Sequence, residues 1–341
     1  MSKTQQSFNC TFSPNIPVIM NNLNISLIFS LGITGDVVML GADGNEKLIH
    51  LQQNFNNPTS IAREGDKLAI ACKSEVIELT NELNISVFFP NERGIYETLY
   101  FPVMSYYTGQ TELHDLKYID NSLLAVDKST SSICRINENY IYHMEWNSND
   151  FNKFGETARL NISGFAIEDE KARYVTADKI DVDTYSQTKY DRNRGVLVDI
   201  KTNEILLEGL SCPNSPRIYN DKLYFLNSGK GELCVFNREE KSYEVINDLG
   251  GYACGMDKFG DYLFIAVSGF ASDDKTEENL FCGIVVIHLP SQFLVGRIKF
   301  NNPTGAVTDC KVIEGYTRAG FCSFVNDFSQ ISFPHPAESI A

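Results

Sequence analysis

A short strand pattern recurs along the chain, and it constrains the fold more than any other feature of the sequence. Each copy has a turn, an apolar strand and a small polar tip. The copies are DKLAIACKS (66–74), NSLLAVDKS (121–129), DKLYFLNSGK (221–230) and GDYLFIAVSG (260–269). A second apolar strand usually follows each copy, so the pattern predicts a series of antiparallel hairpins.

Another short strand precedes most of these pairs, and its copies are regularly spaced. NNPTSIA (56–62) and NNPTGAV (301–307) share their first four residues. The spacings along the chain are 56, 50, 51, 40 and 50 residues, counted between Pro58, His114, Gly164, Ser215, Gly255 and Gly305. Periods of about 40 to 50 residues with several strands each are typical of a β-propeller.

We therefore predict an all-β fold in which residues 1–341 form a single β-propeller. The six marker strands favour six blades. Seven blades are the alternative, because the terminal segments contain enough strands for one more. A pair of two-sheet β-sandwiches is the other architecture that short strands of this kind build.

The ring of blades is expected to close through the two ends of the chain. Residues 305–328 would pair with strands at 24–31, 36–44 and 46–54. Closure of this kind covers the loose edge of the first blade. The terminal segments 1–20 and 329–341 are expected to be peripheral.

The composition bears on partners and compartment. With 29 Lys and Arg against 44 Asp and Glu, the net charge is −15. Nucleic acids and anionic membranes need a basic face, so neither is expected as a partner. The chain shows no secretory signal and no run of about 18 apolar residues. Nine cysteines, an odd count without a C-x-x-C pair, indicate reduced thiols and a cytoplasmic protein.

No cofactor and no metal are expected. The sequence contains no dinucleotide glycine motif, no P-loop, no H-E-x-x-H and no Cys/His cluster with zinc spacing. Asp178, Asp181 and Asp183 alternate like the first ligands of a calcium loop. The glycine and the closing glutamate of such a loop are absent, so a solvated turn is favoured over a loose Ca²⁺ site.

Four segments in the middle half of the chain carry a family resemblance. They are TGQTELHDL (108–116), GFAIEDEKARYVTA (164–177), GLSCPNSPRIYNDKLYFLNSGKGEL (209–233) and GGYACGMDKFGDYLFIAVSG (250–269). In this order they resemble an uncharacterised bacterial family, known as a domain of unknown function and sometimes grouped with tetratricopeptide proteins. The resemblance implies a propeller-like fold and brings no established activity.

The chain departs from that family's pattern at three positions. The family tends to have histidine at the places of Asn161 and Asn214, and arginine at the place of Cys254. Three other polar residues of the pattern are kept: His114, Asp115 and Arg217. If the two histidines do chemistry in the family, this chain has a different activity or none.

His114 and Asp115 are the predicted catalytic residues. In a propeller the first strand of each blade lines a central channel, and loops at one end converge on a shared pocket. An imidazole exchanges protons near neutral pH. Neighbours on a strand point to opposite faces, so Asp127 or Asp178 is as good a partner for the imidazole as Asp115. The alternative is a structural histidine that is hydrogen-bonded between blades.

Several polar side chains are predicted to bind a substrate at the same mouth. Arg217 could hold a carboxylate or phosphate through its bidentate fork, with an inter-blade salt bridge as the alternative. Ser215 is a hydroxyl on an inner strand, although no nucleophile motif surrounds it. The tips of the second strands add four more candidates: Lys128, Asp178, Lys179 and Asn227.

Trp146 is the last predicted binding residue. It lies in YIYHMEWNSNDF (140–151), the most aromatic stretch of the chain, and could wall a pocket. Packing of an outer strand is the alternative interpretation.

Two functions remain open at this point. The first is an enzyme of the lyase, cyclase or hydrolase type that handles a small molecule or peptide at the channel mouth, with His114 as acid–base and Arg217 as anion anchor. The second is a non-catalytic ligand-binding or protein-interaction propeller. Fold alone decides neither, because propellers serve both uses.

Overall fold

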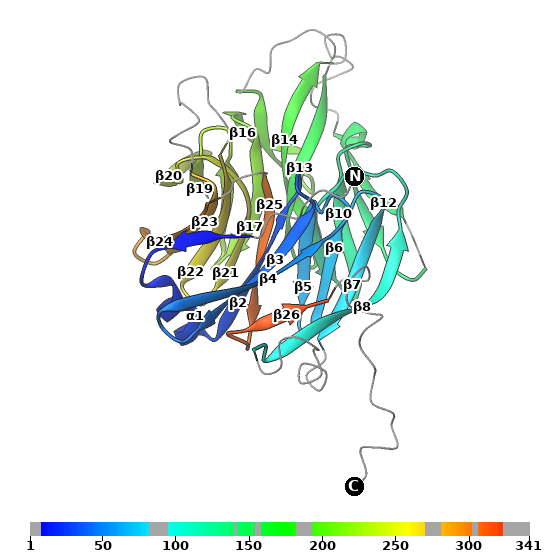
Figure 1. Cartoon of the computed structure of the whole chain (residues 1–341). Coiled ribbons are helices and arrows are strands. Elements are labelled where there is room, and N and C mark those ends of the chain that lie inside the picture. The colour runs from blue at the N-terminus through cyan, green and yellow to red at the C-terminus, as the bar shows by residue number, and fades with distance from the viewer. Residues whose placement is uncertain are drawn as a thin grey trace.

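The computed structural model describes residues 8–81, 95–139, 142–151, 153, 158–181, 193–269, 281–301 and 306–322. Strands in these ranges form six sheets arranged in a ring, with neighbouring inner strands in contact (Figure 1). The prediction of a six-bladed β-propeller is confirmed, and the seven-bladed and sandwich alternatives are excluded.

Each blade runs from an inner strand outward. Blade 1 contains β25 (Val307–Glu314), β2 (Ile25–Leu31), β3 (Asp36–Asp43) and β4 (Lys47–Asn54). Blade 2 contains β5 (Ser60–Glu64), β6 (Lys67–Ala71), β7 (Glu75–Asn81) and β8 (Thr98–Tyr107). Blade 3 contains β9 (Leu113–Ile119), β10 (Ser122–Asp127), β11 (Ser132–Ile136) and β12 (His143–Asn147), followed by a short 3₁₀ helix (Ser148–Asp150).

The other three blades repeat this order. Blade 4 contains β13 (Ala158–Glu168), β14 (Lys171–Asp181), β15 (Gly195–Asp199) and β16 (Glu204–Leu210). Blade 5 contains β17 (Pro213–Tyr219), β18 (Lys222–Asn227), β19 (Glu232–Asn237) and β20 (Ser242–Asp248). Blade 6 contains β21 (Tyr252–Phe259), β22 (Tyr262–Ser268), β23 (Gly283–His288) and β24 (Phe293–Phe300).

The ring closes in blade 1, where strands from both ends of the chain pair. β25 lies antiparallel to β2 from Ile25 opposite Glu314 to Leu31 opposite Val307. Figure 1 shows β25, in orange, beside the blue N-terminal strands. The predicted pairing is thus confirmed for residues 307–314, which join the sheet of β2, β3 and β4, whereas 319–321 pair with β8 of blade 2 instead and 323–328 lie outside the described residues.

Segments near both termini extend two other blades. β1 (Cys10–Phe12) pairs with β24 at the outer edge of blade 6, and β26 (Ala319–Phe321) lies parallel to β8. Helix α1 (Ile16–Leu23) starts beside Pro17 and ends at Asn24, whose φ of 53° breaks the helix. Its Ile16 and Met20 side chains are buried in the core. Residues 10–23 therefore pack against the ring, and 329–341 lie outside the described residues.

The core is divided among the junctions between blades. Middle strands such as β3 are buried along almost their whole length, because a neighbouring blade covers each face. Each of the six junctions has its own apolar cluster. At the junction of blades 6 and 1, Phe29 stacks on Phe300 with ring centroids 4.8 Å apart, and Phe8 packs edge-on against Phe300.

The nine cysteines are free thiols, and six of them are buried. They fill core positions as small apolar side chains do. In the described part of the chain, no helix has the length and apolar character needed to cross a membrane.

The inner strands are bound to each other by side chains as well as by packing. Backbone register slips near the start of several inner strands, and Asp115, Ser215 and Gly255 there have positive φ angles. Such bulges turn a side chain sideways from its own sheet. Here the turned side chains reach the backbone of the next blade.

One hydrogen bond of this kind occurs at each of the six junctions. Five side-chain oxygens accept from a backbone N–H of the next inner strand, and one serine hydroxyl donates to a carbonyl. The pairs are Asp309 Oδ2 with Ile61 N (2.9 Å), Ser60 Oγ with Leu116 N (2.9 Å), Asp115 Oδ2 with Phe165 N (2.7 Å), Ser163 Oγ with Pro213 O (2.5 Å), Ser215 Oγ with Gly255 N (3.0 Å) and Asp257 Oδ2 with Val312 N (2.9 Å).

Gly164 makes room for this arrangement. A Cβ atom at this position would lie 2.9 Å from Asp115 Oδ2, 2.9 Å from Pro216 Cδ and 3.0 Å from Ser215 N. These contacts are too short for carbon, so a side chain at 164 would separate blades 3 and 5.

We predict that Gly164→Ala lowers the free energy of unfolding by about 1–3 kcal/mol, the usual cost of overpacking a tight site. Urea denaturation followed by circular dichroism measures the change. A decrease of less than about 0.5 kcal/mol in the free energy of unfolding is typical of a surface substitution. Such a result would show that the inner strands around residue 164 can accommodate a methyl group.

Candidate functional site

Asp115 lies at the centre of a buried ion cluster inside the channel. Arg217 from blade 5 reaches it with two nitrogens, Nη2 to Oδ1 at 2.6 Å and Nη1 to Oδ2 at 3.2 Å. Lys117 Nζ lies 2.7 Å from Oδ2 and 3.7 Å from the centroid of the Phe165 ring. Asp115 and Arg217 are both buried. The carboxylate therefore joins blade 3 to blades 4 and 5.

The cluster fixes the charge state of its members. Burial by itself raises the pKa of Asp115, but Arg217 and Lys117 outweigh it and hold that pKa well below its usual range. Burial likewise opposes the charge on Arg217, and Asp115 reverses this and raises the pKa of the guanidinium. Burial, followed by the nearby Arg217 charge, lowers the pKa of Lys117. Asp115 is thus a carboxylate at neutral pH.

This geometry decides what Asp115 and Arg217 are free to do. The fork of Arg217 binds a carboxylate, as its chemistry suggested, but that carboxylate belongs to Asp115. Asp115 in turn directs its oxygens to Phe165 N, Lys117 and Arg217, and among the described residues neither oxygen has a hydrogen bond with His114. The structure therefore pairs Asp115 with Arg217 and not with the imidazole.

A second cluster repeats the first one elsewhere in the channel, and the sequence analysis missed it. Lys311 Nζ lies 2.7 Å from Asp309 Oδ1, two residues before it on β25, just as Lys117 follows Asp115 on β9. The signal was an Asp-x-Lys spacing shared by HDLK (114–117) and TDCK (308–311). The charge of Lys311 contributes to the lowered pKa of Lys117, so the two clusters lie within electrostatic range of each other.

At the channel mouth, His114, Lys128 and Asp178 come together from blades 3 and 4, with Cys254 from blade 6. The charge of Lys128 influences the pKa of each of the other three groups, so its ammonium lies within electrostatic range of all of them. His114 and Lys128 are both partly exposed. Among the described residues, neither side chain has a hydrogen bond or an ion pair. This group is named the mouth site here.

Burial is the largest influence on the pKa values of the mouth site, although part of each side chain stays exposed. Burial and then Lys128 lower the pKa of His114 to about 3, against smaller opposing effects of Asp115 and Asp127. Burial raises the pKa of Asp178, and burial raises that of Cys254 to about 12. At neutral pH His114 is therefore an uncharged imidazole and Cys254 a thiol.

Four other predicted residues lie apart from this group or are already engaged. Ser215 Oγ accepts from Gly255 N within the inner ring, and Asn227 is buried between Ser211 N and Glu232. Lys179 follows Asp178 on β14 and is partly exposed. Trp146 lies on the outermost strand of blade 3 and packs against the apolar cluster between blades 3 and 4. The structure does not bring Trp146 to the channel.

No group of three or more His, Cys, Asp or Glu side chains in the described ranges could hold a metal ion. The expected alternative of a loose Ca²⁺ site falls partly outside those ranges, because Asp183 is not described.

We predict that Asp115→Asn lowers the free energy of unfolding at pH 7 by about 3–5 kcal/mol, because Arg217 and Lys117 then lie buried without their counter-charge. The carboxyl has a lower pKa in the folded chain than its unfolded value of about 3.9. The contribution of this carboxylate to the free energy of unfolding is therefore present above about pH 3.9 and is lost as the pH falls below that value.

Denaturation at pH 7 and at pH 3 measures both effects. The difference in stability between wild type and Asp115→Asn should shrink at pH 3. A difference that stays the same at both pH values would contradict the ion-cluster interpretation.

We further predict that the His114 imidazole stays neutral from pH 7 down to about pH 4, which ¹⁵N chemical shifts of the ring measure. Since the folded pKa lies below the usual 6.5, the unfolded chain takes up the proton first, and stability falls as the pH drops from about 6.5 towards 3. Lys128→Met should raise this pKa, whereas Lys222→Met on the opposite face should not. Titration near pH 6.5 in the wild type would refute the prediction.

Comparisons with known proteins agree with this fold. A chain of a nidogen/laminin complex is 10% identical and superposes with a TM-score of 0.54, covering 86% of this chain and 99% of its own. A protein of unknown function from Bacteroides caccae is 8% identical with a TM-score of 0.53, covering 85% of this chain and 99% of its own. Identities this low show the fold alone.

No curated protein matches the chain. A family model matches it over residues 14–321, which includes every blade, the ion clusters and the mouth site. The resemblance noted in the sequence is thus confirmed, and the chain belongs to the family described as domain of unknown function DUF4915.

Proposed function

We propose that this propeller binds a small organic anion at the mouth site and does not convert it. The observation that carries the proposal is the ammonium of Lys128, a partly exposed cation with no hydrogen bond or ion pair in the described structure, which follows β10 at the same end of blade 3 as His114. Carboxylates and phosphates are the natural counter-ions of such a group.

The neighbours of Lys128 suit the binding of a hydroxylated or partly protonated anion. A neutral imidazole offers one donor and one acceptor nitrogen. Asp178 has a raised pKa because it is buried, so it accepts a proton more readily than an exposed carboxyl and can then donate a hydrogen bond. Two different hydrogen-bonding groups therefore lie within electrostatic range of one positive charge.

The same features speak against proton-transfer catalysis. A general acid–base works best with a pKa near the operating pH. The pKa of His114, about 3, is far below it, and the Cys254 thiol with its pKa of about 12 is a poor source of thiolate. The family resemblance adds support, because Asn161, Asn214 and Cys254 replace two histidines and an arginine at the starts of inner strands.

A panel of small anions tests the proposal. Citrate, malate, phosphate and pyrophosphate are screened by thermal shift, and each hit is measured by isothermal titration calorimetry. Lys128→Met should weaken binding at least about tenfold, a loss of roughly 1.4 kcal/mol. Lys222→Met is the control, since Lys222 is an exposed lysine on the opposite face. Both variants should fold, because neither side chain makes a hydrogen bond in the described ranges.

Two results would reject the proposal. Equal affinity of wild type and Lys128→Met for every hit would place the anion elsewhere. Conversion of a hit, followed by proton NMR over hours and abolished by His114→Ala, would favour the enzyme hypothesis of lyase, cyclase or hydrolase type instead.

A further inference from the structure

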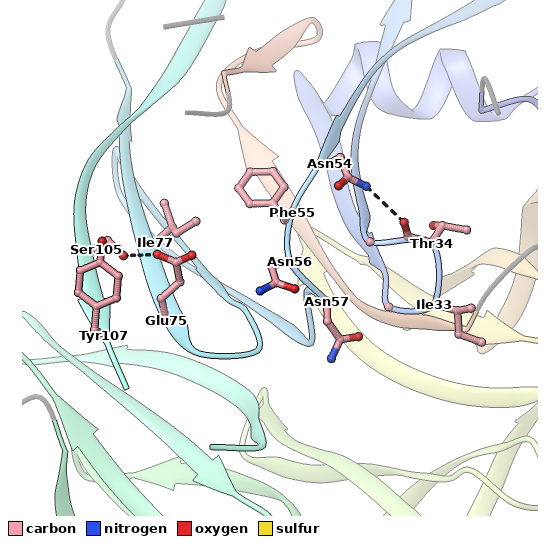
Figure 2. A pocket seen from close by; sticks show the side chains of 12 residues that line it. Ile33, Thr34, Asn54, Phe55, Asn56, Asn57, Glu75, Ile77, Ser105 and Tyr107 are labelled. Atoms are coloured by element: carbon pink, nitrogen blue, oxygen red, sulfur yellow. Dashed lines mark hydrogen bonds between the residues drawn. The ribbon is translucent and has the colours of Figure 1, made fainter. Parts of the chain in front are cut away.

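A groove of about 720 Å³ opens between blades 1 and 2, outside the channel. It lies between the loop that joins β2 to β3, the loop that joins β4 to β5, and the ends of β7 and β8. Figure 2 shows Glu75, Ser105 and Tyr107 on one side, Ile33 and Thr34 on the other, and Asn56 and Asn57 between them. The volume falls in the range of about 300–1,000 Å³ that is typical of ligand pockets.

The wall on the blade 1 side is held in place by backbone contacts. Phe55 N donates to Gly35 O at 2.7 Å, and Asn54 Nδ2 donates to Thr34 O at 3.3 Å (Figure 2). Gly35 has a φ of 79°, and a Cβ atom there would lie 2.8 Å from Phe55 O. The two loops are therefore locked together, and the groove exists without a ligand to shape it.

Glu75 gives the groove a negative charge. Its Oε2 accepts from Ser105 Oγ at 2.6 Å, which fixes the carboxylate on the wall (Figure 2). Its Oε1 has no hydrogen bond among the described residues. The described lining contains no Lys or Arg side chain. Lys73, whose backbone N–H donates to Asn56 O, is exposed and outside the lining.

An aromatic ring and two free amides complete the surroundings of this carboxylate. The Tyr107 side chain is 74% exposed, so its ring is accessible to a ligand. A cation over such a ring is attracted by its negative face. Asn56 and Asn57 are exposed, and their amide oxygens have no bound donor in the described ranges. All four groups offer electron density to a positive ligand.

We propose that this groove is a binding site for an organic ammonium ion with an alkyl chain. The ammonium pairs with Glu75 Oε1 and lies against the Tyr107 ring, and the chain lies over Phe55 and Ile77 on the groove floor. The net charge of −15 raises the local concentration of cations and speeds their arrival. Free diamines and lysine side chains of peptides carry this chemistry, and the experiment separates them.

Calorimetric titration with cadaverine at low ionic strength tests the site. Wild type should bind it, and 1,5-pentanediol, which has hydroxyls in place of both ammonium groups, should bind at least about tenfold more weakly. Glu75→Gln keeps the size of the side chain and should weaken cadaverine binding at least about tenfold, and Tyr107→Leu a few-fold. Glu46→Gln, an exposed carboxylate on the turn between β3 and β4, is the control.

Two further arms identify the source of the ligand and its independence from the mouth site. A peptide with one central lysine that binds more tightly than cadaverine would assign the groove to proteins, and the reverse order would assign it to free amines. Lys128→Met should leave cadaverine binding unchanged. Equal binding of cadaverine by wild type and Glu75→Gln, or equal binding of 1,5-pentanediol and cadaverine by wild type, would overturn the proposal.

Discussion

The carboxylate of Asp115 determines how three blades lie relative to one another. It accepts the Phe165 backbone N–H from blade 4 and the guanidinium of Arg217 from blade 5. Packing alone is tolerant of small slides between blades, whereas a buried bidentate ion pair has one geometry. A well-packed apolar pair is often as stable as a buried ion pair. The ion pair instead fixes the relative positions of blades 3, 4 and 5. Blades 3 and 4 also contain His114, Lys128 and Asp178 of the mouth site.

The hydrogen bonds between the inner strands also explain which polar side chains remain available to a ligand. Buried donors and acceptors must find partners, and the inner strands meet that need from neighbouring blades. The side chains of Ser60, Ser215 and Asp309 form hydrogen bonds of this kind and are therefore not available to a ligand. At the channel mouth, the side chains of His114 and Lys128 form no hydrogen bond between blades among the described residues. Spare hydrogen-bonding capacity is therefore a sign of function that only the structure reveals.

Much of the fold could be predicted from sequence, because a propeller is a local pattern repeated. The spacing of the repeats located all six inner strands. Because the ring must close, the sequence also predicted that a strand from 305–328 pairs with 24–31. Segments that pack on the outside of the ring carry no such pattern, so α1 and β1 were not foreseen.

The candidate site was harder to predict than the fold. Sequence could name Arg217 and Asp115 but not pair them. Their contact crosses blade 4 and depends on the missing side chain of Gly164. Distances across a ring of blades are set by packing, and no spacing along the chain encodes them. The same limit applies to the groove, whose lining comes from four separate stretches of blades 1 and 2.

The charge of the whole molecule and the charge of Lys128 have opposite signs, and the distance over which each field acts decides which one a ligand experiences. At physiological ionic strength the field of exposed charges fades over about 8 Å. The −15 net charge therefore acts weakly on a small anion that has already reached the mouth. Lys128 would act on a bound anion at contact distance, and near a protein surface a single charge is worth several-fold more than in bulk water. The proposed binding of an anion at the mouth site is therefore compatible with an acidic molecule, as is the proposed binding of a cation in the groove between blades 1 and 2.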